Sequence, residues 1–336
     1  MNNIHSQSVP STINKKVRIF NRLERDIDKE FPFQFKKNNL FSDGLIFVIT
    51  GLIIPFICAM ILEVAFSLHE SVLKESNSWQ FYLNSFVYYG SNGLGWIILY
   101  LRNKKDTPRN YFYWFIYFPI ICALMFEILV FSFFSSSQYK TEITNLSSMA
   151  GQIIGEILII IFFLCQRIES GKIAATFRKE KFPLLLLVII VIIMMFILST
   201  IICSYLIEQK LMNVKESDNQ KQLNSVLNSN NQAIFIFGYI SLILLTVIVA
   251  PLCEEICMRY SVFYLTGNRY VAIFVSGFYF GFVHYGLEGD FQHLLSYTSA
   301  GLILAYLFNY TNGNITYNWL THASYNIISL IVTVTS

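Results

Sequence analysis

The strongest constraint on this chain is the repeated occurrence of apolar runs close to the length of a bilayer span. A helix needs about 20 mostly apolar residues to cross the hydrocarbon core, and nine stretches approach that length. They cover approximately residues 45–66, 81–101, 111–134, 150–166, 184–207, 233–258, 270–286, 292–311 and 315–334. Two are short and one is polar at its start, so we expect about eight or nine spans. Only helices and closed barrels satisfy their backbone polar groups in lipid, and the sequence therefore predicts an all-α, polytopic transmembrane helix bundle.

The composition excludes the main classes of water-soluble protein. Of the 336 residues, 54% are hydrophobic and 13% are charged, whereas a soluble domain carries roughly a quarter charged residues. The apolar residues also occur in blocks rather than in an alternating pattern. A soluble enzyme, a secreted module and a disordered chain are therefore excluded.

The basic residues indicate how the chain is oriented. Nineteen of the 24 Lys and Arg residues fall in the tail 1–44, in the loops 102–110 and 167–183, or at Arg259 and Arg269. The remaining five lie in the loops that alternate with these. Because cytoplasmic loops of membrane proteins are enriched in Lys and Arg, we expect a multi-pass protein of the cell membrane with a cytoplasmic N-terminus. The tail is polar and basic and the first apolar run is long enough to span, so we expect no cleavable signal peptide.

Polar and cysteine residues in the first two thirds of the chain suggest structural roles. Glu63, Glu127 and Glu156 each lie on a different early span, where we expect them to pair with a hydroxyl or amide of a neighbouring helix or to lie near an interface. The segment 208–232 is the sizeable polar loop of this region. The six cysteines lie in or beside apolar stretches without zinc-site spacing, and we expect them to fill space. They are Cys58, Cys122, Cys165, Cys203, Cys253 and Cys257.

The run APLCEEICMRY contains charged residues within the sixth apolar stretch. At about 100° per residue, Glu255 and Arg259 share one helix face and are spaced for an ion pair. Glu254 points about 100° away from Glu255 and is free to face another neighbour. Pro251 removes one backbone hydrogen bond just before the two acids. Ionisable residues inside a span are costly, so two adjacent glutamates at this place are functional candidates.

The next span and the last span each carry a pair of their own. In SGFYFGFVHYG, Phe280 and His284 share a helix face, and the GxxxG formed by residues 277 and 281 allows a close helix approach. In THASYN, His322 and Asn326 are four residues apart on one face. Each pair is a weak signal alone, but three consecutive pairs on separate helices of one bundle form a strong constellation.

Helix geometry predicts that the first two pairs meet. A turn at residues 266–269 would join two antiparallel helices, and Glu254 and His284 each lie about 20 Å from it at ~1.5 Å per residue. His322 lies about 12 Å along its own helix from Asn314. It reaches the same depth only if that helix starts deeper or is tilted.

These residues resemble the CAAX-protease and bacteriocin-processing family of intramembrane endopeptidases, also called the Abi family. The family pattern has the motifs EExxxR, FxxxH and HxxxN or HxxxD. Here they read as Glu254-Glu255 with Arg259, Phe280 with His284, and His322 with Asn326. The resemblance covers about residues 245–330. It departs at Tyr260, where members often have Gly, and we expect the larger side chain to alter packing near Arg259.

The basic residues, the apolar stretches and the resemblance together divide the chain into three regions, and the resemblance implies a role for each motif residue. The regions are a cytoplasmic basic tail (1–44), N-terminal transmembrane helices and loops (45–232), and a catalytic transmembrane core (233–336). Glu254 would be the base that activates water, with His284 orienting or deprotonating that water. His322 and Asn326 would stabilise the oxyanion, Asn326 through its amide N–H. Glu255, paired with Arg259, would hold the electrostatics of the site and the helix of Glu254.

Several alternatives stay open at this point. Glu254, His284 and His322 supply a two-His, one-Glu set that zinc hydrolases use, although no compact HExxH helix is present, so a metal-free mechanism is favoured. A transporter would line an ion path with the same residues, but no inverted repeat is visible. A non-catalytic partner, such as a bacteriocin self-immunity protein, would tolerate Glu254→Ala.

The resemblance and the apolar spans together bear on the class of substrate. We expect a peptide or membrane-protein substrate in the lipid bilayer and no nucleic acid. The Asn-, Ile- and Lys-rich composition is typical of a bacterial chain and argues against a prenylated substrate.

Overall fold

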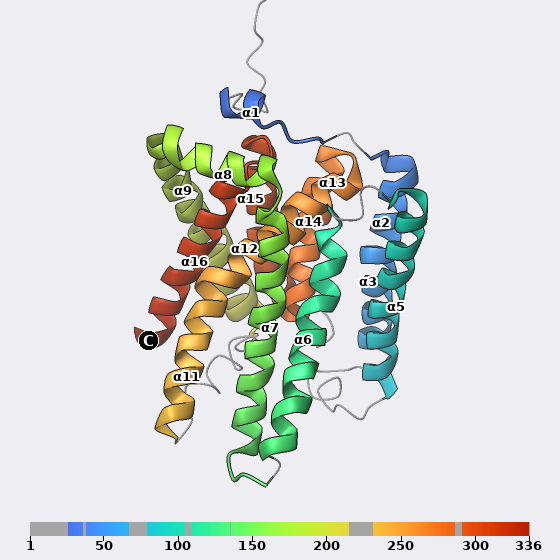
Figure 1. The fold of residues 1–336 in the computed structure, drawn as a ribbon, viewed down its shortest axis with the longest axis vertical. Helices are drawn as coiled ribbons and strands as arrows, with labels where there is room; N and C mark the ends of the chain where they lie inside the picture. Colours follow the sequence, from blue (N-terminus) through green and yellow to red (C-terminus); the bar gives the residue numbers. More distant parts are fainter. Residues whose placement is uncertain are drawn as a thin grey trace, which may run out of the picture.

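The structure, a computed structural model, describes residues 26–35, 38–66, 79–104, 109–134, 136–214, 231–285 and 291–335. Within these ranges the chain is helical and contains no strand. The predicted all-α bundle is therefore confirmed. Figure 1 shows long helices side by side, with the shorter α8 lying across one end of the bundle.

Each predicted apolar stretch coincides, to within a few residues at its ends, with a helical segment of the described residues. The segments are Leu40–Phe66 (which ends in α3, Ile54–Phe66), α5 (Trp79–Arg102), α6 (Tyr111–Phe134), α7 (Lys140–Leu164), Lys181–Leu211 (α9, Lys181–Met195, then η4, Phe196–Leu211), Gln232–Thr266, α14 (Arg269–Tyr285), α15 (Leu294–Tyr310) and α16 (Ile315–Thr335). The short helices α1 (Asp26–Glu30) and α8 (Arg167–Lys179) lie outside them. Of the described helices, five are long and apolar enough to cross a membrane. The predicted count of eight or nine spans is not confirmed.

The segment Gln232–Thr266 changes its helical spacing several times. It runs through α11 (Gln232–Ile243), the π-helix η5 (Leu244–Val249), α12 (Ala250–Glu254), the π-helix η6 (Glu255–Ser261) and α13 (Val262–Thr266). Pro251 lies at the start of α12. π-Helical turns inside α-helices occur frequently at functional sites, and here the two glutamates lie where α12 passes into η6.

The turn after this segment is the one predicted at residues 266–269. Gly267 ends α13 in the left-handed conformation with φ of 68°. A Cβ atom at this position would lie 2.0 Å from the carbonyl oxygen of Asn38. Glycine is therefore required twice, by its backbone conformation and by the close approach of the N-terminal segment.

Helices α14 and α15 pack closely through glycines. A Cβ on Gly281 would lie 2.3 Å from Thr298 Oγ1, and a Cβ on Gly301 would lie 2.5 Å from the carbonyl oxygen of Gly277. The expected close approach at the GxxxG of α14 is confirmed, and α15 is the helix that approaches.

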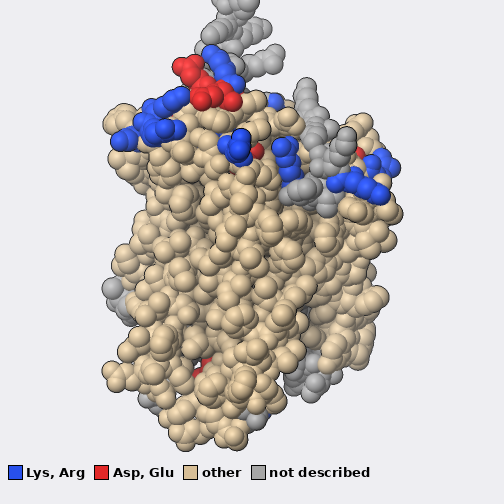
Figure 2. Space-filling model, viewed as in Figure 1, with Lys and Arg blue, Asp and Glu red and all other residues tan. Residues whose placement is uncertain are grey.

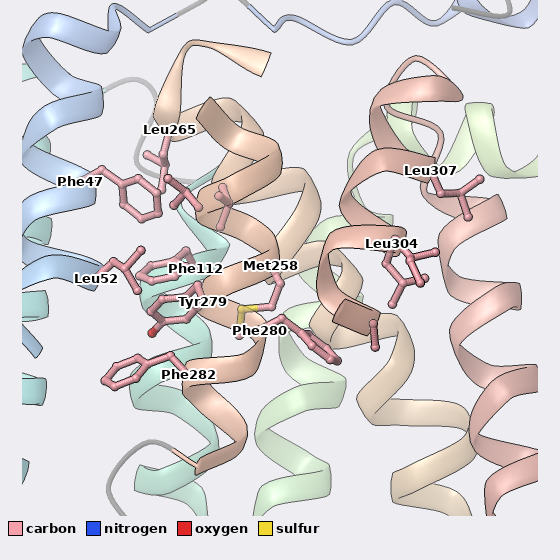
Figure 3. Close-up of a cluster of buried hydrophobic side chains, with 14 of the residues drawn as sticks. Phe47, Leu52, Phe112, Met258, Leu265, Tyr279, Phe280, Phe282, Leu304 and Leu307 are labelled. Carbon is pink, nitrogen blue, oxygen red and sulfur yellow. The ribbon is translucent and has the colours of Figure 1, made fainter. Parts of the chain in front are cut away.

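Buried aromatic residues of α14 connect the N-terminal helices to the site. Figure 3 shows Tyr279 and Phe280 on opposite sides of α14. Tyr279 packs on Phe112 of α6 with 4.5 Å between ring centroids, while Phe280 points toward the third motif. The core therefore fixes the rotation of α14 about its axis.

Helix α8 is held at its end of the bundle by buried polar contacts. Lys172 Nζ lies 3.2 Å from Asp28 Oδ1 of α1 and donates to the carbonyl oxygen of Asn312 at 2.9 Å. Burial lowers the pKa of Lys172, while Asp28 opposes this shift. The hydroxyl of Tyr260 donates to Glu169 Oε1 of α8 at 2.8 Å. Tyr260, at the position where members of the resembled family often have Gly, thus has a hydrogen-bond partner on α8.

The predicted loop 208–232 begins later in the structure than the sequence indicated. Helix η4 continues to Leu211, and Glu208 is fully buried within it. The backbone N–H of Ser296 donates to Glu208 Oε1 at 2.8 Å, so the acid belongs to a helix contact with the start of α15. Most of the predicted loop lies outside the described residues.

Candidate active site

The three predicted motifs meet around the carboxylate of Glu254. Its Oε2 lies 3.9 Å from His284 Nε2 on α14 and 3.8 Å from His322 Nε2 on α16. The first distance confirms the depth expected for Glu254 and His284. The second resolves the uncertainty about His322, whose helix starts from a buried turn and runs obliquely across the bundle (Figure 1).

The two glutamates have opposite surroundings. Glu255 Oε2 lies 3.2 Å from Arg259 Nε, and both side chains are 0% exposed. The side chains of Glu254 and His284 are 15% and 21% exposed. Glu254 and His284 therefore keep part of their side-chain surface accessible, whereas the Glu255–Arg259 pair is sealed inside the protein.

The sealed carboxylate of Glu255 orients the third motif. Its Oε1 lies 2.9 Å from His322 Nδ1, and its Oε2 accepts a hydrogen bond from Asn318 Nδ2 at 3.0 Å. Because a carboxylate paired with Arg259 only accepts, Nδ1 of His322 carries the shared proton. The other ring nitrogen of His322, Nε2, faces Glu254 Oε2 at 3.8 Å.

Aromatic rings frame the charged groups. Phe280 meets His284 edge-on at a centroid distance of 4.7 Å, and the guanidinium of Arg259 lies 4.7 Å from the centre of the Phe280 ring. On its other side, His284 stacks on Tyr297 of α15 at 4.6 Å with 14° between the planes. These contacts hold the imidazole of His284 between two elements.

Asn326 contacts the site differently from the other motif residues. Its Nδ2 donates to the backbone carbonyl oxygen of Thr246 at 2.8 Å. Thr246 lies in η5, before Pro251 and two turns before the glutamates. The structure thus brings together five of the predicted residues: Glu254, Glu255, Arg259, His284 and His322. One amide N–H of Asn326 instead donates to the backbone that precedes the two glutamates.

Sequence reasoning missed three supporting residues. Asn318 lies four residues before His322, as His322 lies four residues before Asn326. This repeated spacing on one helix face was a sequence signal for Asn318. Ser276 accepts from Arg259 at 3.2 Å and donates to the carbonyl oxygen of Met258 at 2.7 Å. Ser276 and Tyr297 have no local sequence signal, because their partners lie on other helices.

The isolated glutamates lie on separate helices, as their sequence positions require. Glu63 lies on α3 and Glu127 on α6. Glu156 is buried in α7 and accepts a hydrogen bond from Gln152 Nε2 at 2.9 Å. This amide lies on the same helix and not on a neighbouring helix as expected.

The side chains as placed do not fit a metal ion. No group of three His, Cys, Asp or Glu residues in the described part of the chain has an arrangement that holds one. All six cysteines are free, and Cys253 and Cys257 lie with their sulfurs 4.0 Å apart.

A comparison with protein families matches the segment that contains the site. Residues 236–328 match the family described as type II CAAX prenyl endopeptidase Rce1-like, and this range includes all three motifs. The family resemblance predicted from the motifs is confirmed. At the general level the match supports a protease of the CAAX type, and together with the apolar helices it indicates a membrane protein.

The wider comparisons add a full-length relative. An uncharacterised protein of Mycoplasma capricolum subsp. capricolum is 29% identical over 317 residues, which is 92% of each chain. The similarity therefore extends beyond the family segment into the N-terminal helices. No solved structure matches the chain.

Proposed function

We propose that this protein is an intramembrane endopeptidase that hydrolyses a peptide bond at or within the membrane. The observation that carries the proposal is the partly exposed carboxylate of Glu254 between two imidazoles, next to the fully buried pair of Glu255 and Arg259. Peptide hydrolysis needs a base for water, donors for the oxyanion and an acid for the leaving amine. Each need has a candidate group within this site.

In the proposed reaction, Glu254 removes a proton from a water molecule that His284 orients. The resulting hydroxide attacks the carbonyl carbon of the peptide bond. His322 donates to the oxyanion from Nε2 when both of its ring nitrogens are protonated, and the carboxylate of Glu255 stabilises that imidazolium. The second N–H of Asn326 is the predicted further donor. The bond between the carbonyl carbon and the amide nitrogen then breaks, and Glu254 gives its proton to the leaving nitrogen. The products of this hydrolysis are a new carboxyl terminus and an amine.

The proposed setting is a cell membrane with the N-terminus in the cytoplasm. On the face drawn in Figure 2, the Lys and Arg side chains gather at the end of the molecule that carries α1 and α8, and the rest of the surface is uncharged apart from a small acidic spot. This distribution supports the orientation expected from the positive-inside rule. The proposed substrates are peptides or membrane proteins that enter from the bilayer.

The experiment compares newly formed protein termini in host membranes by mass spectrometry. It uses wild type, Glu254→Gln and the control Glu127→Gln, which neutralises a glutamate on α6. Termini that appear with wild type and the control but disappear with Glu254→Gln establish proteolysis and identify substrates. Identical termini in all three strains, with all three proteins folded, reject catalysis and favour a binding role such as bacteriocin self-immunity.

A further inference from the structure

The backbone upstream of Glu254 leaves one carbonyl oxygen without its helical donor. In η5 the hydrogen bonds follow π spacing, and the N–H of Ala250 donates to the carbonyl oxygen of Leu245, five residues earlier. The next bond in this register would join the N–H of residue 251 to the carbonyl oxygen of Thr246. Residue 251 is proline and has no N–H. A backbone carbonyl left without a donor in lipid is costly.

The side chain of Asn326 supplies the missing donor. Its Nδ2 lies 2.8 Å from the carbonyl oxygen of Thr246. The hydroxyl of Thr246 is used elsewhere, since it donates to the carbonyl oxygen of Leu242 at 2.8 Å. The bond from Asn326 is therefore a tie between α16 and the main chain at the proline.

A second contact joins the same two segments on the other side of Pro251. His322, one turn before Asn326, lies 2.9 Å from Glu255 through its Nδ1. The earlier residue of α16 thus contacts the later residue of the partner segment, which makes the two segments antiparallel here. With one contact on each side of Pro251, α16 is held against α12, whose last residue is Glu254.

We propose that Asn326 is a positioning residue whose amide fills the hydrogen bond that Pro251 leaves open at Thr246. The bond fixes the break in the helix and thereby sets the distance between Glu254 and the imidazole of His322. This inference rests on the proposed function for its effect on rate, but the hydrogen bond itself is independent of any activity. It differs from the predicted oxyanion role, which would use the second N–H of the same amide.

A double-mutant cycle with Pro251 tests the inference in the full-length protein. Pro251→Ala restores a backbone N–H that can reach the carbonyl oxygen of Thr246, so it replaces the bond lost in Asn326→Ala. We expect Asn326→Ala to lower kcat by about 10²-fold, the cost of misplacing a catalytic group by about 1 Å, with little change in KM. In the Pro251→Ala background the same change removes only the proposed oxyanion donor, because the bond to Thr246 is replaced, and it is expected to cost kcat less.

Thermal unfolding of the same four proteins is the arm that needs no activity. Asn326→Ala is expected to lower the Tm in the proline background and to change it little in the alanine background. If the wild type cleaves nothing, this arm still tests the hydrogen bond. Pro251→Ser restores the same N–H and takes the place of Pro251→Ala if the latter does not fold.

Equal losses in both backgrounds overturn the proposal. If Asn326→Ala lowers kcat by the same factor whether residue 251 has an N–H or not, Asn326 acts on the reacting atoms and not through Thr246. If it lowers the Tm by the same amount in both backgrounds, the bond to Thr246 does not hold the two segments together.

Discussion

Replacing Arg259 with methionine removes one partner from the sealed ion pair and keeps much of the side-chain volume. Arg259 Nε lies 3.2 Å from Glu255 Oε2, with neither side chain exposed. Glu255 would retain His322 and Asn318 as partners but would lose its cation. Removing one member of a buried pair costs about 3–5 kcal/mol, because the other charge is left without compensation. We expect the free energy of unfolding to fall by that amount.

The chain offers a matched control in an exposed ion pair. Arg102 Nε lies 2.5 Å from Asp43 Oδ1, and the two side chains are 50% and 21% exposed. Exposed pairs contribute about 0–1 kcal/mol, so Arg102→Met is expected to have a small effect. The double variant Glu255→Gln with Arg259→Met removes both charges and should recover part of the loss.

Equilibrium unfolding in mixed micelles, followed by circular dichroism, measures these free energies. The reasoning is refuted if Arg259→Met and Arg102→Met destabilise the protein equally. It is also refuted if removing both charges of the buried pair is as costly as removing Arg259 alone. In either case the burial of the pair would not control its energy.

Three further predictions concern packing, pH and metal. Gly301→Ala places a methyl group 2.5 Å from the carbonyl oxygen of Gly277 and should lower the free energy of unfolding by about 1–3 kcal/mol. Gly90→Ala is the control, because a methyl group there would have nothing within 4 Å. An equal loss of stability in both variants would contradict the close α14–α15 contact. Burial raises the pKa of Glu169 above its ordinary 4.5 despite the hydrogen bond from Tyr260, so the folded state holds this proton more tightly and loses that stability as the pH rises through the folded pKa. The Tm of wild type should therefore fall more steeply above pH 4.5 than that of Glu169→Gln, and parallel curves would exclude this origin. Excess EDTA should leave the cleavage rate of the purified protein unchanged, whereas loss of the rate with recovery on adding Zn²⁺ would require a metal mechanism.

Local spacing predicted the contacts that lie within one helix or across one turn. Glu255 and Arg259 are four residues apart, and helix geometry alone brings them together. Glu254 and His284 lie at similar distances from the turn at residues 266–269, so counting residues predicted their common depth. These predictions hold although Glu255 and Arg259 lie in the π-helix η6, because four residues still make nearly one turn there.

The contacts that sequence did not predict depend on changes in regularity and on distant segments. The bond from Asn326 to Thr246 requires π spacing before Pro251, and that spacing is a property of the folded backbone. Tyr260 was expected to disturb packing near Arg259, but its partner Glu169 lies 91 residues away on a helix that crosses the end of the bundle. Hydropathy located the apolar helices, yet it did not determine how many of them cross the membrane.

Hydrolysis of a purified substrate in water enriched in ¹⁸O tests the central claim most directly. The substrate is one identified from the membrane comparison, and the reconstituted proteins are wild type, Glu254→Gln and Glu127→Gln. The account predicts one ¹⁸O atom in each new carboxyl terminus for wild type and the control, and a rate lower by about 10²–10⁴-fold for Glu254→Gln, the range for loss of a general base. Cleavage by Glu254→Gln at the wild-type rate would contradict the account.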